Sequence, residues 1–336
     1  MKDILDKVVS GQNLSIEEAE RAMDIIMSGE ATDAQIACYL TALRMKGETI
    51  DEITGSAKGM RNKCTQLKSD HDLLEIVGTG GDKTNTFNVS TVSSIVCAAN
   101  GTYVAKHGNR SVSSKCGSAD CFEALGVKLD ITKDQNEQVL NDTNICFMFA
   151  PVYHSAMRFV GPARKQMGIR TLFNILGPLA NPAYATLQVM GVYTPELVEP
   201  LANVLKNLGI KRAMVVSGYD GMDEVSLCGK TKAAEIRNGE IKVYDIDPAD
   251  YGIPYAKLEE IQGGDKEENK QIALDILNGE HGPKRDMVVL NSAVALYTVY
   301  EDKTMAECVE LAKELIDSKK ALEKLNEFAE ATQKYA

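Results

Sequence analysis

The chain has 336 residues, of which 44% are hydrophobic and 25% are charged, and its formal net charge is −11. This length and apolar content suffice for one large or two unequal soluble domains, and the excess of acid argues against nucleic acid or an anionic membrane as a partner. No apolar run reaches the roughly 18 residues of a membrane-spanning helix, and the acidic, amphipathic start does not resemble a signal peptide, so we expect a cytoplasmic protein.

The first 65 residues are predicted to form helices. A capping box places Ser or Thr before a helix and Glu or Gln three residues later, where each side chain bonds the other residue's backbone N–H. We expect a small helical domain at residues 1–66, joined by a helical stretch at about 152–180. Three capping boxes occur in series at Ser15-x-x-Glu18, Thr32-x-x-Gln35 and Thr49-x-x-Glu52.

The rest of the chain, residues 67–151 and about 181–336, is predicted to form an α/β domain with a mostly parallel central sheet. Short apolar strands alternate with helices, which is typical of a parallel sheet covered on both faces. An antiparallel ribbon is expected at 223–246 with a turn at Asn238-Gly239, and the tail at 265–335 is expected to hold two or three helices. The 8 cysteines form no CxxC pair and are predicted to be reduced, buried thiols. The strands are expected at 73–77, 102–106, 145–150, 186–194 and 213–218, and the helices at 90–99, 118–126, 136–142 and 195–208.

The acidic residues are unevenly distributed. Residues 83–119 and 143–195 contain no Asp or Glu, although the chain holds 48 acids in 336 residues. Buried strands and tight loops exclude acids anyway, but this does not explain why basic residues remain there, so we favour an anionic ligand between the two stretches. The basic residues in them are Lys83, Lys106, Arg110, Lys115, Arg158, Arg164, Lys165 and Arg170.

A glycine-rich loop, "GTGGD" at 78–82, follows the first predicted strand. A strand, a glycine turn and a helix form a phosphate-binding arrangement, because bare backbone N–H groups converge at the start of the helix. The loop matches neither GxGxxG nor GxxxxGK[ST], and Asp82 is unusual in a plain phosphate cradle. From the loop alone, a simple tight turn stays an equal alternative.

A second polar loop, "KHGNRSVSSKCGSAD" at 106–120, follows the next strand. Ligands of open α/β sheets bind at the carboxyl ends of the strands, so both loops would line one crevice. Backbone donors on one side and cations with hydroxyls on the other would suit a ligand with several phosphates. The alternative is a serine-rich solvated loop. The polar residues are Lys106, His107, Asn109, Arg110, Ser111, Ser113, Ser114, Lys115 and Ser118.

Three motifs, "GTGGD…NVST", "KHGNR…SS…GSAD" and "GIRTLFNILGPLANP" (168–182), resemble those of the anthranilate phosphoribosyltransferase family of tryptophan biosynthesis. The resemblance covers nearly the whole chain. It implies a fold of the nucleoside phosphorylase/phosphoribosyltransferase type and transfer of phosphoribose from 5-phosphoribosyl 1-pyrophosphate to the amine of anthranilate. The resemblance implies these donor-binding residues: Gly78, Gly81, Asp82, Thr86, Asn88, Val89, Ser90, Thr91, Lys106, Asn109, Arg110, Ser113, Ser114 and Ser118. The glycines would let the backbone approach the donor.

The same resemblance implies a magnesium site at Asp223 and Glu224 in "GMDEVS", with Ser90 as a further ligand and two ions per subunit. Carboxylate and hydroxyl oxygens are ligands that Mg²⁺ accepts. From spacing alone, an Asp-Glu pair indicates only a solvated turn. Lys106, Asp223 and Glu224 are the residues to which the resemblance gives a catalytic role.

The acceptor pocket implied by the resemblance contains Gly78, His107, Asn109, Arg164 and Pro178. A guanidinium suits a carboxylate because it can form two parallel hydrogen bonds. His107 has an equal alternative role as a residue that braces its loop without transferring a proton. His71, His154 and His281 lie outside the motifs and receive no role.

Catalysis is expected to depend mainly on positioning and on stabilising the leaving group. Breaking the bond to pyrophosphate develops negative charge, which magnesium, Lys106 and loop N–H groups would stabilise. An aromatic amine is already neutral at pH 7, so no strong general base is needed before attack.

Two rival functions remain: a pyrimidine nucleoside phosphorylase, which needs no Asp-Glu metal pair, and a non-catalytic relative that binds nucleic acid. A homodimer and an association with anthranilate synthase subunits are also expected.

Overall fold

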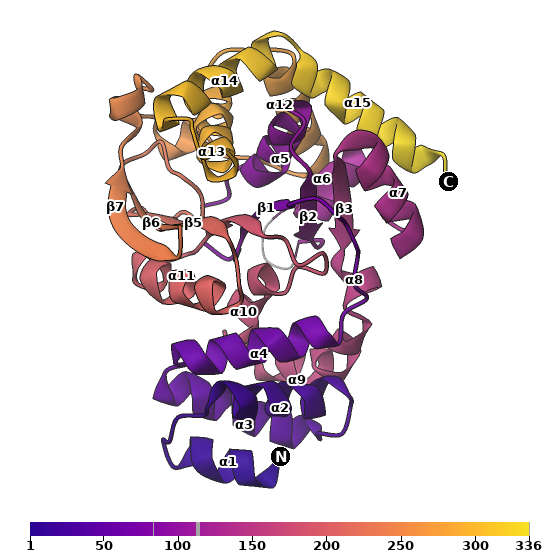
Figure 1. Cartoon of the computed structure of the whole chain (residues 1–336), viewed down its shortest axis with the longest axis vertical. Coiled ribbons are helices and arrows are strands. Elements are labelled where there is room, and N and C mark those ends of the chain that lie inside the picture. The colour runs from indigo at the N-terminus through magenta and orange to yellow at the C-terminus, as the bar shows by residue number, and fades with distance from the viewer. Residues whose placement is uncertain (83, 112–114, 336) are drawn as a thin grey trace.

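A computed structural model describes residues 1–82, 84–111 and 115–335. The N-terminal helices lie at one end of an elongated molecule, and a seven-stranded sheet with its covering helices forms the other end (Figure 1). No helix among these residues is long and apolar enough to cross a membrane.

Four helices form the N-terminal end of the molecule. All three predicted capping boxes are present at Ser15, Thr32 and Thr49, so the predicted starts of the second, third and fourth helices are confirmed. Buried apolar side chains from all four helices share one core. The helices are α1 (Lys2–Val9), α2 (Ile16–Met27), α3 (Asp33–Lys46) and α4 (Ile50–Asn62).

A second helical stretch packs against these four helices. Its residues Ala156, Val160 and Ala163 belong to the same core as α2 and α3. That core continues into Val198 and Leu201 beneath the sheet, so apolar packing links the two ends of the molecule. The stretch comprises α8 (Ala150–Tyr153), the 3-10 helix η1 (Ser155–Phe159), α9 (Gly161–Met167), α10 (Phe173–Leu176) and the 3-10 helix η2 (Gly177–Leu179).

The sheet has the strand order β3-β2-β1-β4-β5-β6-β7. The first five strands in this order pair in parallel, while β6 and β7 add an antiparallel ribbon. This confirms the predicted fold class of a small helical part and an α/β part with a mostly parallel sheet. The strands are β1 (Leu74–Gly78), β2 (Val104–Gly108), β3 (Ile145–Phe149), β4 (Leu187–Gly191), β5 (Arg212–Gly218), β6 (Thr231–Arg237) and β7 (Glu240–Ile246).

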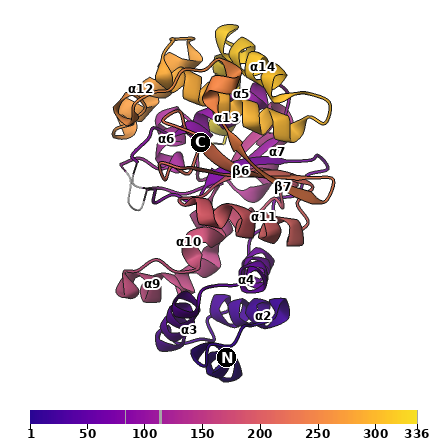
Figure 2. The same ribbon diagram turned by 90° about the vertical axis from the view of Figure 1, so that its left-hand side faces the viewer.

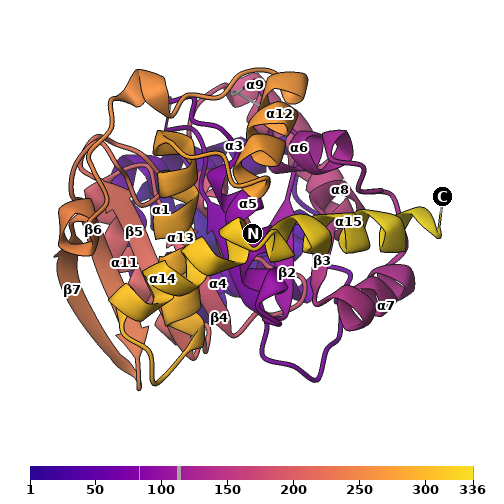
Figure 3. The ribbon, with the colours of Figure 1, turned by 90° about the horizontal axis from the view of Figure 1, so that it is seen from above.

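Helices cover both faces of the sheet. The α5 and C-terminal helices lie on the upper face, and α11 lies on the lower face, toward the helical end (Figures 1 and 2). Seen from above, α15 crosses α5 and reaches α7 (Figure 3). The covering helices are α5 (Val89–Ala99), α6 (Ser118–Ala124), α7 (Lys133–Thr143), α11 (Val198–Asn207), α12 (Lys266–Leu277), α13 (Pro283–Val299), α14 (Met305–Asp317) and α15 (Lys320–Gln333).

The predicted antiparallel ribbon and its turn at Asn238-Gly239 are confirmed, but two details of the C-terminal half were predicted wrongly. The ribbon begins at Thr231 rather than at residue 223, because residues 223–230 form a loop over the sheet edge. The tail contains four helices among its described residues, not two or three. Lys319 separates the last two helices by adopting a left-handed conformation (φ 64°), which a non-glycine residue rarely does and sequence patterns do not signal.

The topology places a crevice at the carboxyl ends of β1 and β4. The chain proceeds from β1 to β2 and β3 on one side and from β4 to β5 on the other. Strand order therefore reverses between β1 and β4, which is where open α/β sheets bind their ligands.

Candidate active site at the carboxyl ends of the central strands

Two paired glycines make room for Asp223 at the crevice. Gly78 ends β1 and lies opposite Gly191 at the end of β4. A Cβ on Gly78 would lie 2.9 Å from Cγ of Asp223, and one on Gly191 would lie 2.5 Å from its carbonyl carbon. The structure thus gives Gly78 a reason beyond the predicted approach of bare backbone to a ligand, because the space beside it holds Asp223.

The glycine loop also binds Asp223 directly. Gly80 N donates to Oδ2 of Asp223 at 2.6 Å, although the two residues lie 143 positions apart in sequence. Gly80 and Gly81 have φ values of +69° and +74°, a region that glycine adopts without strain. The fold thus brings the "GTGGD" loop and the "GMDEVS" segment together, as the sequence predicts.

Three carboxyl groups influence one another here. Burial, and after it the charge of Asp82, raise the pKa of Asp223 to about 7. Burial and then the charge of Asp223 raise the pKa of Glu224 to about 8. Buried acids close together favour their protonated forms unless a cation compensates their charge, so this is chemistry that suits a divalent ion.

The protein side chains do not complete a metal site by themselves. Among the residues that the structure describes, no three His, Cys, Asp or Glu side chains are grouped to hold an ion. Mg²⁺ normally keeps waters and binds substrate phosphates besides one or two carboxylates. Asp223 and Glu224 fit that pattern if a phosphorylated ligand supplies further oxygens.

Lys106 lies next to these acids. Its side chain is 1% exposed, and Nζ donates to the carbonyl of Ile76 at 2.6 Å and to Oγ of Ser90 at 3.2 Å. Burial lowers the pKa of Lys106 to about 8, and the charges of Glu224 and Glu75 oppose this effect. A buried cation within reach of Ser90 is well placed to contact an anionic ligand.

The start of α5 contributes the "NVST" residues. Ser90 is half-buried in the first helical turn, whereas the side chain of Val89 is fully buried, which leaves only its backbone for a ligand. Oδ1 of Asn88 and Oγ1 of Thr91 are buried without a hydrogen-bond partner among the described residues. These unpaired oxygens and the helix N-terminus form an environment for a polar ligand.

The remaining predicted donor-binding residues are more dispersed. Thr86 pairs with Gln262 in an isolated bridge. The Asn109 carbonyl accepts from Ser118 Oγ at 3.5 Å, which holds the second loop against α6. Arg110 contacts two acids of that helix, Asp120 and Glu123, at 2.9 and 2.8 Å, so its charge is already compensated. Ser113 and Ser114 lie outside the described residues.

His107 lies on the opposite face of β2 from Lys106. It is 6% exposed, and its ring centroid lies 4.9 Å from that of His154. Burial lowers the pKa of His107 well below 6.5 and that of His154 to about 4, so both rings are neutral at pH 7. His154 received no role from the sequence motifs. It lies shortly after the end of β3, however, and ligands of open α/β sheets bind at the carboxyl ends of strands, so this position was a usable signal.

Pro178 and Arg164 lie on the segment that returns to the helical end. Pro178 is buried in η2, and its carbonyl accepts from Nε2 of Gln188 at 2.7 Å. Arg164 is half-buried in α9, with Cζ 5.1 Å from the ring centroid of Phe173, and burial lowers its pKa. No ion pair of Arg164 occurs among residues 1–82, 84–111 and 115–335, so its charge is available to an acidic ligand.

Arg170 contributes a contact that the sequence did not predict. Its guanidinium donates to the Gly81 carbonyl and lies over the ring of Tyr193, with Cζ 4.3 Å from the ring centroid. Nη1 of Arg44 donates to the carbonyl of Arg170. The glycine loop is thereby joined to the α3 helix of the helical end.

Comparison with known proteins decides the family. Two models of a glycosyl transferase family match the chain, the helical bundle domain over residues 2–64 and the a/b domain over residues 70–322. An anthranilate phosphoribosyltransferase of Ruminiclostridium cellulolyticum is 53% identical over 335 residues, covering 100% of this chain and 98% of the relative. The chain belongs to the anthranilate phosphoribosyltransferase family.

Solved structures agree with this assignment. Anthranilate phosphoribosyltransferase from Thermus thermophilus matches with a TM-score of 0.94 at 40% identity, over 98% of this chain and 99% of that one. The Saccharomyces cerevisiae enzyme in complex with PRPP and Mg matches with a TM-score of 0.91 at 28% identity, over 99% and 98% of the two chains. The predicted resemblance is thus confirmed, and the two rival functions gain no support.

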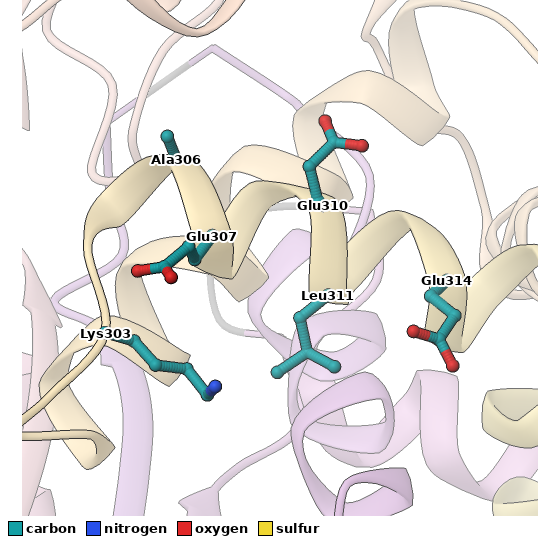
Figure 4. Close-up of a pocket in the computed structure, with 6 residues that line it drawn as sticks. All are labelled: Lys303, Ala306, Glu307, Glu310, Leu311 and Glu314. Carbon is teal, nitrogen blue, oxygen red and sulfur yellow. The ribbon is translucent and has the colours of Figure 1, made fainter.

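A surface hollow along α14 is unrelated to the site expected of an anthranilate phosphoribosyltransferase. This hollow, of about 430 Å³, lies along α14 and contains none of the predicted site residues (Figure 4). Three of its six lining residues are Glu and one is Lys, so the hollow has a net negative charge that would repel phosphates. The lining residues are Lys303, Ala306, Glu307, Glu310, Leu311 and Glu314.

Proposed function

We propose that this chain transfers the phosphoribosyl group of 5-phosphoribosyl 1-pyrophosphate to the amine of anthranilate, yielding N-(5′-phosphoribosyl)anthranilate and pyrophosphate. This is the second step from chorismate in tryptophan biosynthesis. One observation carries the proposal beyond family membership: Gly80 N bonds Asp223 across 143 residues of sequence, so the glycine loop and the remote carboxylates form one site.

The donor would bind at the crevice between β1 and β4. Backbone N–H groups of the glycine loop and of the α5 N-terminus would bind its phosphates, and Lys106 would provide a buried cation. The residues we propose for this role are Gly78, Gly81, Asp82, Thr86, Asn88, Val89, Ser90, Thr91, Lys106, Asn109, Arg110, Ser113, Ser114 and Ser118.

Magnesium would be held by Asp223, Glu224 and Ser90, with two ions per subunit. Support comes from the raised pKa values of the two acids and from the yeast relative solved in complex with PRPP and Mg. When bound, the metal supplies positive charge that stabilises the pyrophosphate leaving group.

The acceptor would bind on the His107 side of the sheet, with Gly78, Asn109, Arg164 and Pro178 as the other proposed contacts. Arg164 would bind the carboxylate, since two parallel N–H donors match its geometry. A yeast relative has been solved in complex with 4-fluoroanthranilate, at 27% identity and a TM-score of 0.89 over 99% of this chain and 97% of that one.

The chemistry follows from the charges of these residues. As the C1–pyrophosphate bond breaks, Lys106 and the loop N–H groups stabilise charge on the leaving oxygen. The neutral His107 can accept a hydrogen bond but is a weak base, because its pKa lies well below 6.5. We therefore infer that positioning of the amine, rather than proton removal before attack, gives most of the rate.

We also propose a cytoplasmic homodimer that associates with anthranilate synthase subunits. The helical end exposes Met45 and Val9, which are 83% and 58% accessible, and apolar side chains of this kind favour an interface. Light scattering on the purified chain measures the mass of the assembly, and a monomer would reject the dimer.

The domains would be residues 1–66 with about 152–180, and 67–151 with about 181–336.

The activity is tested by anthranilate fluorescence. We expect loss of the anthranilate signal only when donor, Mg²⁺ and enzyme are all present. Thymidine with inorganic phosphate is the control substrate pair for a nucleoside phosphorylase. Turnover of that pair, without any consumption of anthranilate, would reject the proposed reaction.

A further inference from the structure

Strands β1 and β2 separate after a single register pair. Leu74↔Val104 is the one pair in register between the described parts of these strands. By contrast, β1 and β4 stay in register from Leu74↔Leu187 to Gly78↔Gly191. The gap matters because the proposed donor loop follows β1 and the proposed acceptor residue His107 lies in β2.

Side chains occupy the gap where ladder hydrogen bonds are missing. Lys106 Nζ donates to the carbonyl of Ile76 at 2.6 Å, on the α5 side. On the other face, Oε1 of Glu75 accepts from the backbone N of His107 at 3.3 Å. Buried backbone groups need such partners when strands diverge.

Glu75 is an unusual residue at this position, because a glutamate is rarely fully buried inside a sheet. It is fully buried, and it is none of the residues proposed to bind a substrate or magnesium. Burial raises its pKa to about 8, while Asn181, Lys106, His107 N–H and Arg61 favour its charged form. Its second oxygen, Oε2, has no hydrogen-bond partner among the described residues.

Arg61, in the helical end, likewise has a buried polar atom without a hydrogen-bond partner among the described residues. It lies in the last turn of α4 and is 5% exposed. Its Nε donates to the Leu179 carbonyl at 2.7 Å, next to Pro178, while Nη2 has no partner in the described part of the chain. The charge of Glu75 is the first to oppose the effect of burial on the pKa of Arg61.

We propose that Glu75 and Arg61, which make no direct ion pair with each other, act together as a buried positioning pair: each holds one wall of the acceptor pocket through its own hydrogen bond. Glu75 holds the wall that carries His107, and Arg61 holds the wall that carries Pro178. The pair acts on substrate only through these neighbours, so neither is a catalytic residue. The inference rests on the proposed function, because it assumes that anthranilate binds between those walls.

The test is Glu75→Gln, which keeps the size of the side chain but removes its charge. The amide oxygen can still accept from His107 N, but the negative charge that attracts Arg61 is lost. We expect the KM for anthranilate to rise about tenfold, equal to ~1.4 kcal/mol, with kcat and the donor KM changed less than about threefold.

Glu52→Gln is the matched control. Glu52 is also fully buried, and it accepts from Leu14 N at 3.0 Å and from Lys46 at 2.8 Å, but it lies in the helical end away from the site. Both substitutions should lower the thermal midpoint. Only Glu75→Gln should change the KM for anthranilate, which separates positioning from general destabilisation.

Arg61→Lys tests the other half of the pair and serves if Glu75→Gln does not fold. It should also raise the KM for anthranilate, and combining the two changes should raise it less than the product of the single effects. An unchanged KM in either soluble variant, or a change mainly in the donor KM, would overturn the proposal.

Hydrogen exchange gives a readout that does not need turnover. Glu75→Gln should speed amide exchange in β2 and around Leu179, while Glu52→Gln leaves both segments unchanged. Unaltered exchange there would overturn the pair even in an active enzyme. If the unmodified chain fails to consume anthranilate, the proposed function fails separately, and the exchange data still decide whether the pair orders these walls.

Discussion

Replacing Gly191 by Ala should separate the glycine loop from Asp223. The added Cβ would lie 2.5 Å from the carbonyl carbon of Asp223 and 3.3 Å from its Cα, and the backbone there cannot rotate away as a flexible side chain would. An ordinary contact begins at 3.4 Å, and the carbonyl oxygen of Asp223 lies even closer to the added Cβ than the carbonyl carbon does, so the backbone of Asp223 must move by more than about 1 Å. A displacement of that size in a catalytic site costs about a hundredfold in rate.

The assay is the initial rate at saturating donor and anthranilate, with Mg²⁺ varied. Gly191→Ala should lose about a hundredfold in kcat and require more Mg²⁺. Gly229→Ala is the control, because Gly229 lies in the same loop as Asp223 and an added Cβ there meets nothing within 4 Å. A Gly191→Ala enzyme within about threefold of the Gly229→Ala rate would refute this account of the crevice.

Three further predictions test the metal site, the buried histidines and the helical end. Asp223→Asn combined with Glu224→Gln should lower turnover by at least about a hundredfold and change its Mg²⁺ dependence in steady-state assays; near-normal rates would reject the metal role. The pKa of His154 is about 4 in the folded protein and 6.5 for the free side chain, so the unfolded chain binds more protons and the free energy of unfolding falls as pH drops from 6.5 toward 4. In urea unfolding, His154→Gln should remove about 2 kcal/mol of the fall in unfolding free energy between pH 7.5 and pH 5. An equal fall in both proteins would contradict the burial of a neutral ring. Thr32→Ala removes the side-chain oxygen that accepts from Gln35 N and should cost about 1 kcal/mol of unfolding free energy with unchanged kcat/KM, whereas a larger effect on activity than on stability would show that the helical end has a different role.

The sequence predicted the elements that local chemistry determines. The capping boxes located three helix starts, because each depends on residues three positions apart. The parallel strands were predictable because they are short apolar runs between helices. The left-handed Lys319 was not predictable, since nothing in its residue type favours that conformation.

The site was predictable where it lies in consecutive residues. The glycine loop and the polar loop follow neighbouring strands, so the rule about carboxyl ends brought them together. The true environment of Gly78 was not predictable, because it depends on Asp223, which crosses the sheet edge from a distant segment. His154 and Glu75 were missed for a similar reason: their partners come from other strands and from the helical end.

Lys106 and His107 show how one strand can serve both proposed substrates. Successive side chains of a strand point to opposite faces, so Lys106 reaches Ser90 on the α5 side while His107 packs against His154 on the other. Donor and acceptor would therefore approach the end of β2 from opposite faces of the sheet. Beyond Leu74 and Val104, the described parts of strands β1 and β2 have no further register pair, so backbone groups such as the Ile76 carbonyl and the His107 N–H need other partners. Buried polar side chains between these strands, Glu75 above all, satisfy the backbone groups that the missing ladder leaves unpaired.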